Sequence, residues 1–171
     1  MKIRHNLVTL LILLTALGGC GAPPETDNFD PAKEVEAEKR EPLKPLKFEE
    51  LTGRWKLLYA NNYGYDFRFY KNYRSLVILH LNNHALIFKG VYTIENDNDI
   101  KINIYAMKRN PGKRLKLYGG FVKTKSSHFL FQGQVQARGK KPQLVVNPKR
   151  IVIDGNNSDG YFEPVIKLKK G

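Results

Sequence analysis

Apolar and polar residues alternate with a period of two through much of the chain after Phe48, and no other feature constrains the fold as strongly. Every second residue of segment 63–70 is aromatic, and segment 129–137 alternates in the same way. Successive side chains of a strand point to opposite faces, so the pattern predicts half-buried strands. No segment of helical length carries an apolar stripe with a 3.6-residue period. The sequence therefore predicts an all-β domain.

A first hairpin is predicted in LVILHLNNHALIF, residues 76–88. Asparagine tolerates the positive φ that a two-residue turn requires, so the turn is placed at Asn82–Asn83. This turn pairs Leu79 with Leu86 and leaves both faces of the hairpin unusually apolar.

A second hairpin is predicted around the acidic turn NDND, in residues 92–104. A three-residue loop at 97–99 pairs Ile94 with Ile102, whereas a loop of even length would place the isoleucines opposite polar residues. The odd loop is therefore expected.

Further strand candidates are bounded by Gly, Pro, Asn or Asp, namely 54–60, 114–123, 143–146, 151–153 and 161–169. Residues 48–171 suffice for one domain with a single core. About eight to ten short strands with short connections favour a single antiparallel meander barrel, because closure removes exposed strand edges. An open β-sandwich is the alternative.

The first twenty residues have the three parts of a secretory signal. Lys2 and Arg4 precede an apolar run at 7–17, and two glycines precede Cys20. The run is too short to cross a bilayer, which requires about 20 apolar residues. We therefore expect residues 1–19 to be a signal peptide that is removed.

The junction Leu17-Gly18-Gly19-Cys20 resembles the lipobox of bacterial lipoproteins. The resemblance implies acylation of Cys20 and a covalent lipid anchor in the cell envelope, since several acyl chains hold a protein stably on a membrane. Gly21 is not the aspartate that commonly retains such proteins at the inner membrane, so the outer membrane is expected where a cell has one. Cys20 is the single cysteine, which excludes a disulfide in the domain.

Residues 20–47 are rich in Pro, Glu and Lys, and they are predicted to form a disordered, lipidated tether because they cannot bury enough apolar surface to become ordered. The β-barrel domain is expected at 48–171. The chain has 29 Lys and Arg against 16 Asp and Glu, and seven of those acids lie in the tether. The domain is therefore strongly basic and should attract anionic partners.

Gly53 and Trp55 form a Gly-x-Trp motif that resembles the start of the first strand in lipocalins. In that family the glycine lets the chain turn into the strand, and the tryptophan closes the barrel floor beneath a basic side chain from a later strand. Residues 89–104 resemble a hairpin of bacterial lipocalin-like domains. The second family motif, Thr-Asp-Tyr, is absent, and the sequence alone does not identify the basic partner of Trp55.

The resemblance implies that the mouth or interior of the barrel binds a small apolar or anionic amphipathic ligand. Segment 61–74 interleaves aromatic and basic residues, and a second basic cluster follows near 110; the candidate ligand-binding residues are Tyr65, Phe67, Phe69, Arg68, Lys108, Arg109, Lys113 and Arg114. The alternative is a barrel filled by side chains, which acts as an adhesion or interaction protein. Its basic outer face would contact acidic polysaccharide, phospholipid or a protein partner.

Catalytic, cofactor and metal sites are not predicted. No nucleophile elbow, phosphate loop or catalytic cysteine occurs, so we do not expect an enzyme. His80 and His84 have a zinc-like spacing, but the hairpin directs them to opposite faces. Residues 154–160 match a calcium loop only in part and are expected to form a turn. Nucleic acid is not expected as a partner of an envelope protein.

Overall fold

The computed structural model describes residues 43–112, 114–138 and 141–171. The predicted signal peptide, Cys20, most of the tether and Lys113 lie outside these ranges. The elements, in chain order, are α1 (Phe48–Leu51), β1 (Gly53–Leu58), η1 (Ala60–Asn62), β2 (Tyr63–Phe69), β3 (Arg74–Leu81), β4 (His84–Glu95), β5 (Asp99–Pro111), β6 (Val122–Arg138), β7 (Lys141–Ile153), β8 (Asn156–Asn157), η2 (Asp159–Tyr161) and β9 (Ile166–Lys170).

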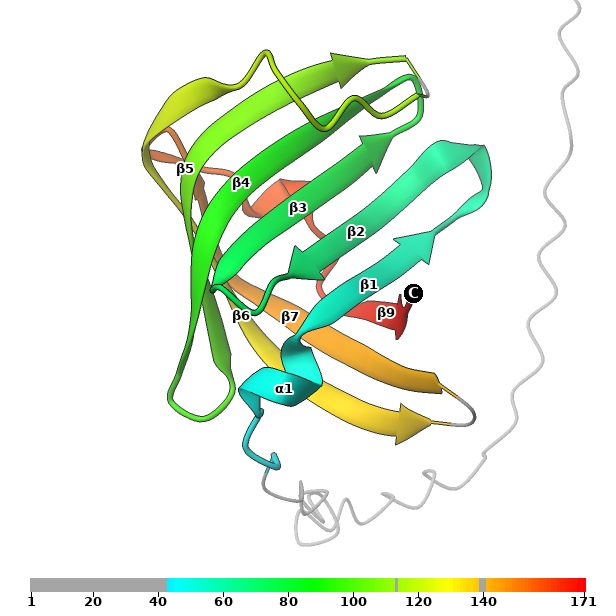
Figure 1. The fold of residues 1–171 in the computed structure, drawn as a ribbon, viewed down its shortest axis with the longest axis vertical. Helices are drawn as coiled ribbons and strands as arrows, with labels where there is room; N and C mark the ends of the chain where they lie inside the picture. The colour runs from blue at the N-terminus through cyan, green and yellow to red at the C-terminus, as the bar shows by residue number, and fades with distance from the viewer. Residues whose placement is uncertain (1–42, 113, 139–140) are drawn as a thin grey trace, which may run out of the picture. The chain divides into compact units, whose positions relative to one another are not determined.

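Eight strands form a closed antiparallel barrel (Figure 1). Each strand from β1 to β7 pairs with the next, β7 pairs with β9, and β9 pairs with β1, which completes the ring. The two-residue β8 only extends β7. The predicted all-β meander barrel is confirmed, and closure excludes the open sandwich. No helix in the described ranges has the length and apolar character that a membrane crossing requires.

The first predicted hairpin has the expected register. Leu79 pairs with Leu86 and Val77 with Phe88, and Asn82 adopts a φ of 53°. The local pattern was sufficient here because a two-residue turn determines which residues face one another.

The second hairpin has the predicted three-residue loop, but the loop lies one residue earlier than predicted. Ile94 pairs with Ile100 rather than Ile102, and the loop is 96–98. Asn98 is buried, and its side-chain amide donates to the carbonyl oxygens of Lys44 at 2.9 Å and Gly133 at 3.2 Å. These contacts with residues far away in the sequence hold Asn98 in the loop.

Four other strand predictions need correction. Residues 114–121 are not a strand but an irregular segment, the strap, and β6 begins only at Val122. The two short candidates 143–146 and 151–153 belong to one strand, β7. The candidate 161–169 contains the end of η2, and its strand, β9, begins at Ile166.

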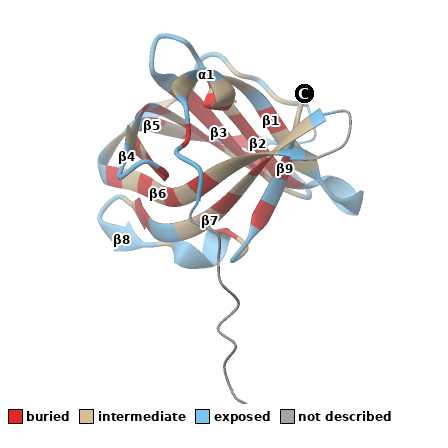
Figure 2. Cartoon of the chain, turned by 90° about the horizontal axis from the view of Figure 1, so that it is seen from below, coloured by how far each residue is buried: buried red, intermediate tan, exposed pale blue. Residues whose placement is uncertain are grey.

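The core fills the inside of the barrel, and buried residues lie along the inner faces of the strands (Figure 2). Its largest fully buried side chains are aromatic, namely Trp55, Tyr92, Phe67, Phe69, Phe88, Phe129 and Phe131. Leu46, in the segment assigned to the tether, also belongs to this core, and its backbone N–H donates to Asp97 O at 2.8 Å. Core contacts therefore begin before Phe48.

Candidate functional site

Trp55 closes one end of the barrel beside α1. The indole is fully buried, and its Nε1 donates to the Leu51 carbonyl oxygen at 2.6 Å. Lys170 Nζ, from β9, lies 5.0 Å from the ring centroid, a distance that permits a cation–π contact. Gly53 has a φ of 129°, which residues other than glycine rarely adopt. Lys170 is therefore a basic side chain that lies against Trp55.

Tyr65, Phe67 and Phe69 point into the barrel and pack against other rings. Phe67 lies 5.5 Å from Phe131 between ring centroids, and Phe69 lies 4.9 Å from Tyr92. Because these side chains contact one another directly, a ligand inside the barrel would have to displace them.

Phe162, which follows η2, occupies the barrel interior near the opposite end from Trp55. Its ring centroid is 5.3 Å from that of Phe131, 5.4 Å from Phe129 and 5.8 Å from Tyr65. Sequence reasoning missed this residue because it belongs to a segment between a turn and the last strand. The ring fills the space that a ligand would enter.

At the same end, which we term the mouth, Glu163 links two tyrosines. Tyr59 Oη donates to Glu163 Oε2 at 2.8 Å, and the Glu163 backbone N–H donates to Tyr65 Oη at 3.1 Å. The hydrogen bond with Glu163, together with burial, raises the pKa of Tyr59 to about 12. A depression of about 150 Å³ lies at this end of the barrel, and Tyr59, Tyr65 and Glu163 are among the residues that line it.

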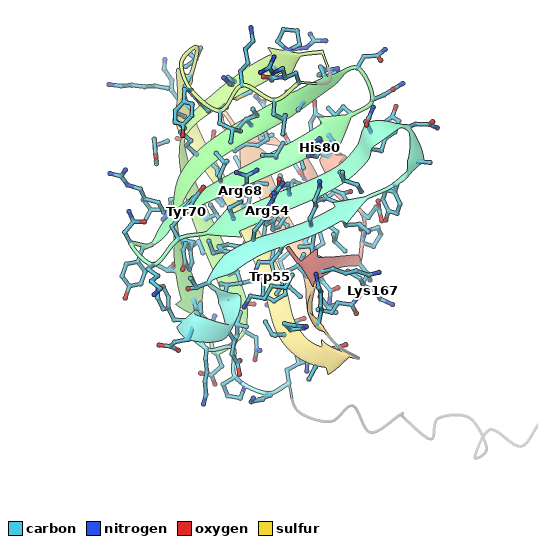
Figure 3. The ribbon with its side chains drawn as sticks, turned by 45° about the vertical axis from the view of Figure 1, so that its right-hand side comes forward. Arg54, Trp55, Arg68, Tyr70, His80 and Lys167 are labelled. Carbon is cyan, nitrogen blue, oxygen red and sulfur yellow. The ribbon has the colours of Figure 1, made fainter. Side chains whose placement is uncertain are left out.

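Arg68 points out of the barrel, away from the neighbouring Phe67 and Phe69. Its guanidinium and that of Arg54 both bind the carboxylate of Asp66, at 2.9 Å and 2.6 Å. The two arginines, which pair across β1 and β2, are labelled in Figure 3. Asp66 is fully buried. Burial raises the pKa of Asp66, but hydrogen bonds from Arg68 and Arg54 outweigh it and hold the pKa below its ordinary value. The three residues form an ion cluster with one excess positive charge.

The strap covers the outer face of β3 and β4. Its Leu115, Leu117 and Phe121 pack on an apolar patch that these strands turn outward, comprising Leu76, Ile78, Ala85 and Ile87. This contact explains why both faces of the first hairpin are apolar: the inner face joins the core and the outer face lies under the strap.

The second basic cluster does not form a single rim. Lys108 is only 8% exposed, and its ammonium donates to the carbonyl oxygens of Tyr118 at 3.1 Å and Gly119 at 3.0 Å. Lys108 therefore holds the strap in place. Arg109 and Arg114 are exposed, and Lys113 lies outside the described residues.

A depression of about 350 Å³ lies outside the barrel, and residues of β2, β3, β4, β5, the turn between β2 and β3, and the strap line it. We term it the outer groove. Its charged and aromatic lining residues are Arg68, Tyr70, Arg74, Lys89, Tyr105 and Tyr118. Of the predicted ligand-binding residues it includes Arg68 alone. Tyr70 and Arg74 belong to the segment 61–74 that the sequence singled out. Lys89, Tyr105 and Tyr118 were missed because only strand pairing and the strap bring them beside that segment.

The two sequence patterns that were weighed as metal sites lie in the first hairpin and in the segment after β7. His80 pairs with Ala85, and His84 pairs with Leu81. Because successive residues of a strand face opposite sides of the sheet, the two histidines point to opposite faces. Asp159 Oδ1, in η2, accepts the Ile151 backbone N–H of β7 at 2.7 Å. Within the described ranges, no group of three or more His, Cys, Asp or Glu could hold a metal ion.

The fold and its surface define a closed eight-stranded antiparallel barrel with an aromatic interior and a basic, tyrosine-bearing groove outside. Comparison of the chain with models of protein families, with curated proteins and with solved structures found no match.

Proposed function

We propose that the chain is a non-catalytic lipoprotein of the bacterial cell envelope, whose barrel presents an outer basic surface to an anionic partner. The observation that carries this proposal is the contrast between an interior occupied by packed rings and an outer groove lined by three cations and three tyrosines. Of the two functions considered from the sequence, the geometry favours the interaction protein over the carrier of a small apolar ligand.

The packing energy supports an outside site. Ring pairs such as Phe129–Phe131 and Phe131–Phe162 contribute about 0.5–1.5 kcal/mol each beyond the burial of their surface. A ligand inside the barrel would have to compensate for several such contacts. Binding in the outer groove leaves these ring contacts intact. The chain has a net charge of +13, and its long-range attraction assists the approach of an anionic ligand.

We further infer that the barrel is related to lipocalins and that a lipid attached to Cys20 anchors the chain. The lipocalin-like relationship is supported by the Gly-x-Trp motif of Gly53 and Trp55 and by the cation of Lys170, which comes from a later strand and lies against the indole. The lipobox-like residues before Cys20 support the anchor. Anchoring at Cys20 would keep the basic barrel close to the anionic components of an envelope.

The anchor can be tested by metabolic labelling with an alkyne-bearing palmitate. The full chain should be labelled, and Cys20→Ala should lose the label and leave the membrane fraction, because no second cysteine is present. Gly21→Asp preserves the cysteine and should stay labelled. Persistent label in Cys20→Ala would show that the lipid, if any, is attached elsewhere.

The binding mode can be tested with the full chain purified in non-ionic detergent. We expect heparin, used as a soluble polyanion, to bind about tenfold or more weakly at 0.5 M than at 0.05 M salt, because salt screens exposed charges. Native mass spectrometry should find no stoichiometric apolar molecule. An extracted apolar ligand at one per chain, together with salt-independent heparin binding or none, would instead favour a carrier.

A further inference from the structure

We propose that the outer groove is a subsite for an acidic saccharide, in which a carboxylate of the sugar binds Arg74 and Lys89 while the sugar ring packs on tyrosine. This inference rests on the proposed function and deepens it, because it names the chemistry and the position of the anionic partner.

Strand register assembles the cationic side of the groove. Arg68 pairs with Leu76, and Leu76 pairs with Lys89, so the two cations lie in one row on the outer faces of β2 and β4. Arg74 begins β3, after a tight turn in which its backbone N–H approaches Asn72 Oδ1 at 3.3 Å. Arg68 lies on the outside of β2, and Tyr70 directly follows that strand (Figure 3).

The cations differ in their availability. Arg68 is engaged by the buried Asp66. None of the five ion pairs among the described residues involves Arg74 or Lys89. Lys89 Nζ lies 3.9 Å from the centroid of Phe121, so a ring of the strap positions its ammonium. Arg74 and Lys89 can therefore bind an added carboxylate without first breaking an ion pair.

Three tyrosines supply the aromatic side of the groove. Tyr70 is 45% exposed, Tyr105 is 47% exposed and Tyr118, on the strap, is 89% exposed. Tyr105 occupies the irregularity between Ile104 and Ala106 in the pairing of β5 with β6, where a bulge changes the direction of a side chain. Exposed tyrosines provide an apolar ring with a polar tip, which suits a ligand that has both characters.

The groove chemistry points to a sugar rather than to a lipid chain. A lipid chain requires an enclosed, mainly apolar cavity, whereas only two leucines, Leu76 and Leu117, line this groove. Its volume of about 350 Å³ is at the low end of the range for small-molecule sites, roughly 300–1,000 Å³. A short segment of an acidic polysaccharide combines a ring face, hydroxyl groups and a carboxylate at this scale.

The test is isothermal titration calorimetry of the full chain in non-ionic detergent with a galacturonate trisaccharide. Its methyl ester, which has the same rings without charge, is the matched ligand. We expect measurable binding of the acid and affinity at least about tenfold weaker for the ester, the loss corresponding to charge-assisted hydrogen bonds. Equal affinity for acid and ester would overturn the role of the two cations.

Variants locate the site. Arg74→Gln with Lys89→Gln should weaken binding of the acid at least about tenfold, whereas Lys167→Gln with Lys169→Gln removes the same charge from β9 and should leave it unchanged. Tyr105→Ala should weaken binding of both acid and ester. Arg74→Gln alone leaves the Lys89–Phe121 contact in place, so its loss of affinity cannot arise from a displaced strap. Melting temperatures of all variants monitor folding.

The remaining outcomes separate this inference from the proposed function. Heparin binding that persists in the groove variants, with no saccharide binding by the wild type, would overturn the subsite and retain the basic interaction surface. Binding to vesicles of anionic phospholipid, lost in the groove variants and without saccharide binding, would replace the sugar by a lipid headgroup. Equal weakening by the β9 variants would mean that net charge alone governs binding and would also overturn the subsite.

Discussion

Replacing Trp55 with alanine should lower the free energy of unfolding by about 3–5 kcal/mol, the usual cost of truncating a large buried aromatic residue. The indole is fully buried, and its removal also leaves the Leu51 carbonyl oxygen without its donor. The cation of Lys170 loses its aromatic partner as well. The effect should therefore lie in the upper part of the range for single substitutions.

Urea unfolding followed by far-ultraviolet dichroism measures this loss, since Trp55 is the single tryptophan and its fluorescence disappears with it. Trp55→Phe retains a buried ring but not the hydrogen bond, and it should cost less. Tyr118→Ala, at an 89% exposed position, should change stability by about 0.5 kcal/mol or less. A cost below about 1 kcal/mol for Trp55→Ala would refute a structural role for the indole.

Replacing Asp66 with asparagine should cost about 3 kcal/mol, because breaking a buried ion pair leaves its partner charge uncompensated. The Asp66 side chain is fully buried, while those of Arg68 and Arg54 are 19% and 44% exposed. Because the Arg54 side chain is partly exposed, water can solvate its charge after the substitution. The loss of stability should therefore lie at the low end of the range for broken buried ion pairs. Glu95→Gln, in the exposed pair with Lys101, is the matched control and should cost less than about 1 kcal/mol.

The same substitution should alter the pH dependence of stability. Although burial opposes ionisation, the two arginines lower the pKa of folded Asp66 below its ordinary value of 3.8. Its stabilising contribution is therefore fully present above the unfolded-state pKa and is lost as the pH falls through the lower folded-state pKa. The stability difference between wild type and Asp66→Asn should be constant from neutral pH to about 5 and shrink below about 4. A difference that is independent of pH would contradict an ionised Asp66.

Local patterns predicted those parts of the barrel in which neighbouring residues determine the structure. The alternation of apolar residues placed Phe67 inside and Arg68 outside, and the turn at Asn82–Asn83 placed Leu79 beside Leu86. The apolar outer face of that hairpin was also a signal that something covers it. The sequence did not identify the covering segment, because residues 114–121 alternate enough to resemble a strand.

The amino-acid sequence by itself determined the all-β class, the barrel of short hairpin-linked strands and the alternation of side chains between the inner and outer faces of the strands. These features depend on a period of two and on turn residues, which act over a few positions. Only the tertiary structure decided that Phe162 fills the interior, that Lys170 lies beside Trp55 and that Arg74 and Lys89 meet Tyr105 across the outer groove. Those contacts join residues far apart in the chain, so they arise only when strand pairing closes the barrel and the strap packs on its outer face.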